Sequence, residues 1–334
     1  MKLTKKPPVI YTQEAFCYGS RPSRGLEIKK NRSRLIRLET SSTFMRTLLI
    51  SISFLLTAWG AMGQSMATEL EKKAKVLSIL RNDVLISDEN KARIEANEEF
   101  ILILEGIIAD PGSFDLGFDS IQKMGVVSSP DGLLRIITWN LPLDEGTHNY
   151  HCYIQTRDRK QQNYKWHKLT DKSKSPVRRD ERKTYSAENW YGALYYEIIP
   201  FRRGRKDSYT LLGWDGNNVL STKKVIDVIN LRKNKPPTFG APIFKFGSNN
   251  TKRVVFEHSA EVTMSLHFDA RKNQIVFNKL EPTRPELKGQ YSFYYPSSTF
   301  QALELSKGKW VHIGEVDFRG GDNRIFNPPP GLQN

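Results

Sequence analysis

The sequence predicts an α+β protein that is predominantly antiparallel β, with a helical hairpin ahead of the β-rich region. Apolar residues recur at helical spacing over residues 64–110. From about Gly125, short runs rich in Val, Ile, Tyr, Phe and Trp alternate with Gly, Asn, Asp and Pro, as in all-β regions. A sandwich, a barrel and a small propeller-like array of sheets all fit this pattern, and no repeat of about 40–50 residues singles out the propeller.

Two helices are expected first. Met66–Arg81 is a charged segment with apolar residues on one face, and Ser87-Asp88-Glu89-Asn90 is typical of the start of a second helix. The second helix is expected to run to about Ala109, where Asp110-Pro111-Gly112-Ser113 would end it. We expect the pair to pack on the β-rich domain, residues 111–318.

About a dozen short strands should follow, each bounded by turn residues such as Ser129-Pro130-Asp131-Gly132. The expected strands are Leu133–Asn140, Thr147–Thr156, Tyr164–Leu169, Trp190–Phe201, Tyr209–Trp214, Lys223–Ile229, Pro242–Phe246, Arg253–Glu257, Val262–Phe268, Gln274–Phe277, Tyr291–Tyr294 and Trp310–Val316. Pro236-Pro237 reads as part of a connection, and residues 319–334 as an extended tail.

Residues 45–63 have the three-part layout of a secretory signal peptide. A short basic start is followed by an uncharged, largely apolar stretch and then by the small residues Ala61 and Gly63. Cleavage between Gly63 and Gln64 would release the protein into the periplasm or the medium. The apolar stretch is shorter than the roughly 20 residues that a spanning helix needs, which favours cleavage.

The alternative is an uncleaved signal anchor in residues 47–63, and only in that case do we expect a membrane association. Residues 1–44 are polar, basic and proline-bearing, with no apolar periodicity. We interpret them as a start assigned too early, with Met45 as the initiator, or as a disordered extension. An anchored protein would keep this basic lead in the cytoplasm.

The charge of the chain is less informative than its total indicates. The formal net charge is +15 over 334 residues, but residues 1–46 hold 11 Lys and Arg against 3 acidic residues. Subtracting their +8 leaves +7 for the remainder. An excess of this size is compatible with anionic glycans or membranes, and it predicts no specific nucleic-acid partner.

Three phrases of the β-rich region resemble an uncharacterised family of exported proteins from Bacteroidota. They are Ser129-Pro130-Asp131-Gly132 with Arg135–Asn140, Tyr209–Asn217, and Phe239–Phe244. The likeness covers about residues 64–318, and Gln64 after the predicted cleavage point suits the same group. The resemblance implies a signal-peptide-bearing, secreted or periplasmic protein of the bacterial envelope, and it implies no activity.

No motif in the sequence specifies a catalytic, metal or cofactor site. His148 and His151 stand three apart on one expected strand, so their side chains should point to opposite faces rather than share a metal. Cys152 lies in an apolar run and reads as a small buried residue rather than a nucleophile. Asp215-Gly216-Asn217-Asn218 reads as a tight turn rather than a calcium loop. We therefore assign no catalytic residue from the sequence, and we expect no metal and no cofactor.

One feature of the sequence indicates ligand binding. Aromatic side chains near basic donors suit sugar or anionic glycan recognition through stacking and charge-assisted hydrogen bonds. The candidate residues are Trp190, Tyr191, Arg202, Arg203, Arg205 and Trp214. The sequence favours a non-catalytic binding or assembly role in the envelope. It does not identify the partner, for which a glycan and an envelope protein are the two candidates. The alternative is a hydrolase of envelope polysaccharide whose dispersed carboxylates leave no local motif.

Overall fold

The computed structural model describes residues 69–160, 163–173, 181–204 and 206–317. All of them belong to one compact unit, Ala61–Asn334. The predicted signal peptide with its cleavage point, the N-terminal extension, the tail 319–334 and Arg205 lie outside the described residues.

Two helices precede the strands, as the sequence predicts. Residues 69–86 are helical, and α2 spans Asn90–Ile108. Their buried side chains include Leu77, Phe100 and Leu104, which pack against Trp139 of the first sheet. The expected cap differs in detail, because Glu89 precedes α2 without a capping side-chain hydrogen bond.

The first sheet has four antiparallel strands in the order β1-β2-β3-β4. The strands are β1 Met124–Ser128, β2 Leu134–Pro142, β3 His148–Thr156 and β4 Lys165–Thr170. Along β2, Ile137 and Trp139 face the helices, whereas Ile136 faces the second sheet. The first sheet is therefore covered on both faces, which is why β2 reads as a nearly continuous apolar run.

The second sheet has the order β5-β9-β8-β7-β6, and β12 also pairs with β8. The strands are β5 Tyr185–Ser186, β6 Leu194–Arg203, β7 Lys206–Asp215, β8 Ser221–Arg232, β9 Lys235–Phe239 and β12 Val254–Ser259. Strand β9 contains Pro236-Pro237, which we expected in a connection. It is tolerated because the ladder with β8 is interrupted between Asn230 and Arg232, where a backbone donor is not required.

The third sheet has the order β11-β10-β16-β15-β14-β13. The strands are β10 Phe244–Phe246, β11 Asn249–Thr251, β13 Leu266–Asp269, β14 Gln274–Pro282, β15 Tyr294–Ser306 and β16 Lys309–Val316. All its pairs are antiparallel except β10 with β16. The segment expected as a strand at Tyr291–Tyr294 is a 3-10 turn, Tyr291–Phe293, that leads into the long β15.

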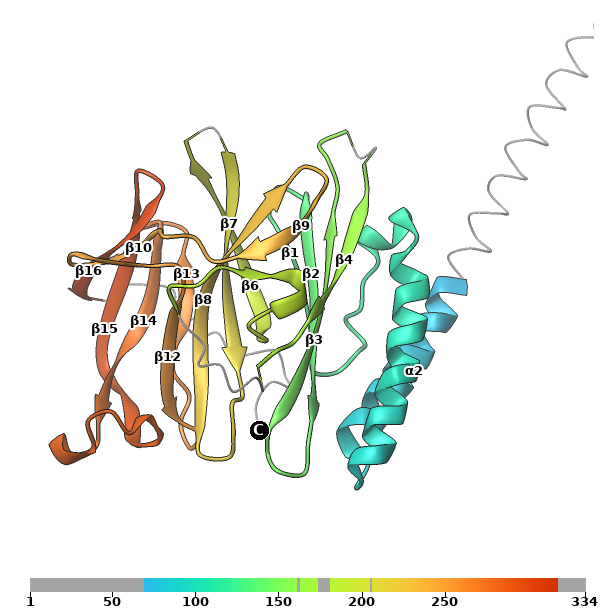
Figure 1. Ribbon diagram of the computed structural model, residues 1–334, viewed down its shortest axis with the longest axis horizontal. Coiled ribbons are helices and arrows are strands. Elements are labelled where there is room, and N and C mark those ends of the chain that lie inside the picture. Colours follow the sequence, from blue (N-terminus) through green and yellow to red (C-terminus); the bar gives the residue numbers. More distant parts are fainter. Residues whose placement is uncertain (1–68, 161–162, 174–180, 205, 318–334) are drawn as a thin grey trace, which may run out of the picture. The chain divides into compact units, whose positions relative to one another are not determined.

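The elements form successive layers: the helices, the first sheet, the second sheet and the third sheet (Figure 1). One apolar core joins each pair of neighbouring layers, so the second sheet, like the first, is buried on both faces. In the described part of the chain the sheets remain open, and of the architectures left open by the sequence this is a stack related to the sandwich. The prediction of a mostly antiparallel fold behind two helices is confirmed.

Candidate functional site

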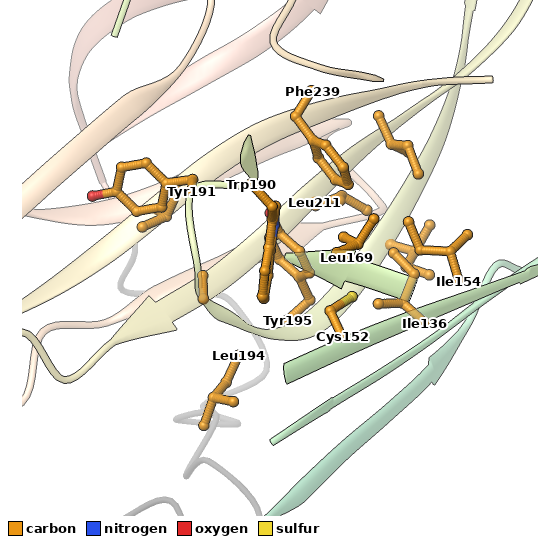
Figure 2. Packing of buried hydrophobic residues seen from close by; sticks show 14 of the residues in the cluster. Ile136, Cys152, Ile154, Leu169, Trp190, Tyr191, Leu194, Tyr195, Leu211 and Phe239 are labelled. Carbon is orange, nitrogen blue, oxygen red and sulfur yellow. The ribbon is translucent and has the colours of Figure 1, made fainter. Parts of the chain in front are cut away.

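Two of the aromatic residues chosen from the sequence lie in the core between the first and second sheets. Trp190 is 1% exposed and donates its ring N–H to the Tyr195 hydroxyl at 3.1 Å. Tyr191 is 4% exposed, and its ring centre lies 5.0 Å from the guanidinium carbon of Arg253. Figure 2 shows Trp190 among the apolar side chains of this cluster. Both rings therefore serve the packing of the fold, and neither offers a face to a ligand.

The remaining candidates lie at the two ends of β7. Trp214, near its C-terminal end, is partly buried and lies 6.0 Å from the ring of His148. Arg202 and Arg203 are exposed at the opposite end, in the β6–β7 hairpin. The structure thus separates the predicted aromatic residues from the predicted basic ones.

The side chains of His151 and Cys152 in β3 pack inside the fold. His151 stacks on Trp139, with ring centres 5.0 Å apart, and hydrogen-bonds Asn97 at 3.1 Å. Burial lowers the pKa of His151 to about 4, so the ring is neutral at physiological pH. Cys152 is 1% exposed, and burial raises the pKa of its thiol well above its usual value. Figure 2 shows it in the apolar cluster, as expected for a small buried residue.

The Asp215 carboxylate, in the turn after β7, accepts hydrogen bonds from other groups of the protein. One oxygen of Asp215 accepts from the Tyr150 hydroxyl at 2.9 Å and from the Asn217 backbone N–H at 2.9 Å. Across the described residues, no group of three or more His, Cys, Asp or Glu side chains is arranged to hold a metal ion.

A basic groove lies between the turn of hairpin β3–β4 and the turn of hairpin β8–β9, with a volume of about 230 Å³. Both turns lie at the same end of the stacked sheets, which is the upper end in Figure 1. The charged lining comprises Arg157, Lys165, Arg232, Lys233, Lys235 and a single carboxylate, Asp158. His167, Asn163 and Asn234 add polar groups. These residues define the basic groove.

Contacts of Arg157 and Lys165 fix the walls of the basic groove. Arg157 donates to the Gly132 carbonyl at 2.8 Å and to Asp115 at 2.7 Å, and its guanidinium lies 4.1 Å from the centre of the Phe114 ring. Lys165 donates to the Asn234 side-chain oxygen at 2.6 Å, which joins the two hairpins directly. Asn234 adopts a positive φ of 57°, as Asn tolerates in tight turns.

The charge of the groove is strongly one-sided. The groove lining holds five cationic side chains and one carboxylate, and Asp115, outside the lining, pairs with Arg157. Arg232, Lys233 and Lys235 are exposed, and no carboxylate of the described residues lies within ion-pair distance of them. Burial, with Lys165 adjacent, lowers the pKa of His167, so this ring adds no charge at neutral pH.

The carboxylates with raised pKa values lie elsewhere. Burial raises the pKa of Glu197 to about 7, although the Phe268 backbone N–H donates to it at 3.2 Å. Burial also raises the pKa of Asp227, which is fully buried and paired with Arg253 at 2.6 Å. Neither residue lines the basic groove. The groove therefore combines many cations with no pair of carboxylates.

The sequence itself carries a signal for this site. Arg232-Lys233-Asn234-Lys235 is a basic run within a tight turn between two strands. Sequence alone could not reveal its partner, because Arg157 and Lys165 lie about 70 residues earlier and belong to another sheet.

Comparisons of the chain with family models, with curated proteins and with solved structures found no match. Among the described residues, no helix has both the length and the apolar character needed to cross a membrane.

Proposed function

We propose that the chain is a non-catalytic binding protein of the bacterial cell envelope or periplasm, which holds an anionic ligand in the basic groove. The observation that carries this proposal is the excess of cations in the groove lining. One exposed turn carries Arg232, Lys233 and Lys235. Among the described residues, no carboxylate lies within ion-pair distance of these three side chains. Like charges held close together repel, and a ligand anion relieves that repulsion while forming charge-assisted hydrogen bonds.

The exposure of these side chains sets the kind of ligand. An ion pair at an exposed site contributes only about 0.2–1 kcal/mol, because solvent and salt screen it. A single anionic group would therefore bind weakly. We infer that the natural ligand carries several anionic groups that contact several of these side chains together.

Binding is favoured over hydrolysis by what the groove contains. Glycoside hydrolysis ordinarily uses two carboxyl groups on either side of the scissile bond. The groove has one, Asp158, and one of its oxygens accepts from the Asn163 side-chain amide at 2.5 Å. The envelope location rests on residues 45–63 and on the resemblance to exported Bacteroidota proteins.

Isothermal titration with inorganic tripolyphosphate at low salt tests the proposal. The variant K233Q/K235Q removes two groove cations, and the control R284Q/K288Q removes two exposed cations near the turn Pro285–Leu287. We expect the groove variant to bind about threefold to thirtyfold more weakly and the control to bind like the wild type. Equal losses in both variants, or no binding by the wild-type protein, would contradict the proposed function.

A further inference from the structure

We propose that the basic groove is one end of a longer track that binds a linear anionic polysaccharide. The track would run from Arg232, Lys233 and Lys235 of hairpin β8–β9, past the described cations of hairpin β3–β4, to Arg202 and Arg203 of hairpin β6–β7. This inference rests on the proposed function and extends it from an anionic group to a class of polymer. Further cations lie beyond the groove, on hairpins that contact its walls.

The β3–β4 turn links the groove to hairpin β6–β7. Arg159 lies two residues beyond Arg157, and its guanidinium is 3.4 Å from Asp207. Arg202 approaches the other oxygen of Asp207 at 3.6 Å. Two exposed arginines thus share one carboxylate of the β6–β7 hairpin. On the other side, Lys165 joins the same β3–β4 hairpin to Asn234 of hairpin β8–β9.

The strand order of the second sheet sets the distance between the β6–β7 and β8–β9 hairpins. The strands β6, β7, β8 and β9 are consecutive neighbours, so the β6–β7 and β8–β9 tips lie two strand spacings apart, about 10 Å. In Figure 1 the coloured ends of the strands that flank these hairpin turns lie at the same end of the stacked sheets. The cations of the β8–β9, β3–β4 and β6–β7 hairpins therefore lie at one end of the stacked sheets, and together they define the row.

The row remains basic after its carboxylates are counted. The five cations of the groove are joined by Arg159, Lys160, Arg202 and Arg203, which are all exposed. Four carboxylates lie among these nine cations: Asp115, Asp131, Asp158 and Asp207. A linear polymer that carries an anionic group on each repeat could neutralise the excess along the row. A small ion could neutralise only part of this excess positive charge.

The character of the row favours a polysaccharide over a nucleic acid. Proteins that bind single-stranded nucleic acid without sequence preference stack bases on exposed aromatic rings. Among the described residues, the exposed aromatic side chains are those of Tyr291 and Phe293. They precede the first residue of β15, whereas the β15–β16 turn follows its last residue, at the opposite end of the strand. Gly308 of that turn lies against the backbone of Arg202 and Arg203, so the turn belongs to the basic end. The row thus offers charge and amide groups, which suit a hydroxyl-rich polyanion.

Titration with heparin-derived oligosaccharides of increasing length tests the track. We expect an octasaccharide to bind at least about tenfold more tightly than a disaccharide, because it can reach additional cations. The variant R202Q/R203Q should weaken octasaccharide binding about threefold to tenfold and leave disaccharide binding unchanged. K233Q/K235Q should weaken both, and R284Q/K288Q neither, with thermal unfolding used to confirm that each variant is folded.

The outcomes separate the two proposals. Disaccharide binding that depends on Lys233 and Lys235, but gains nothing from length or from Arg202 and Arg203, would keep the anion-binding groove and overturn the track. No dependence of any ligand on Lys233 and Lys235 would overturn the groove itself. Tighter binding of a single-stranded DNA oligonucleotide of equal charge would overturn the choice of polysaccharide.

Discussion

Glu197 gives the structure a measurable dependence of stability on pH. Its carboxyl group lies at the bulge of β6, half-buried against the third sheet, and the Phe268 backbone N–H donates to it. Burial disfavours the charged form and raises the pKa from 4.5 to about 7. The folded state therefore holds this proton more tightly than the unfolded chain. It follows that Glu197 costs stability as the pH rises from about 4.5 to about 7, and the cost is constant above that range.

The size of the effect follows from the shift. Each pKa unit corresponds to about 1.4 kcal/mol, so a change from 4.5 to about 7 amounts to at most about 3 kcal/mol at pH 8. Glu197→Gln is nearly isosteric, keeps an oxygen to accept from Phe268, and has no charge to bury. We expect the variant to be more stable than the wild type at pH 8, with the difference shrinking toward zero at pH 4.5.

Urea unfolding of both proteins between pH 4.5 and 8 measures this difference. The difference between the two proteins is needed because His151 and His258, whose pKa values are lowered to about 4 by burial, change the stability of both in the opposite direction over this range. E286Q, which removes an exposed carboxylate, controls for the loss of one charge. A wild-type to E197Q difference that does not change with pH would refute the reasoning.

Three further predictions concern the core and the N-terminus. Arg253→Met should lower the free energy of unfolding by about 3–5 kcal/mol, because it leaves the buried Asp227 carboxylate unpaired. Adding Asp227→Asn should recover part of this loss. Purely additive effects of the two substitutions in denaturant unfolding would contradict a stabilising contact between Arg253 and Asp227. Cys152 should react with iodoacetamide only after unfolding, with peptide mapping used to distinguish it from Cys17. Rapid labelling of Cys152 in the native protein would show that its thiol is not buried. Intact mass of protein from a bacterial host that exports it should give a mature chain beginning at Gln64, whereas a species retaining residues 47–63 in the membrane would indicate an anchor.

The fold class was predictable because it depends on local periodicity. Runs such as β2 and β3 have the residue types of strands and turn signals at both ends, and the two helices show apolar residues on one face. The stacking of three sheets was not predictable in the same way. Whether Ile136 meets a helix or a sheet is decided by segments far away in sequence, and local pattern carries no information about them.

The candidate site shows the same division more sharply. An aromatic residue near a basic turn has the same sequence signature whether its ring is exposed or buried, and Trp190 and Tyr191 are buried. The basic groove depends on the approach of Lys165 to Asn234, which only the packing of the first sheet against the second brings about. The charges of the 232–235 turn were visible in the sequence, but their partner hairpin was not.

Hydrogen–deuterium exchange with and without a heparin-derived octasaccharide tests the central claim most directly, because it locates the ligand without any substitution. We predict protection at residues 157–160, 163–165 and 231–237, and at 202–204 of hairpin β6–β7. Binding accompanied by protection only around residues 283–293, or by no protection at the basic groove, would contradict the account.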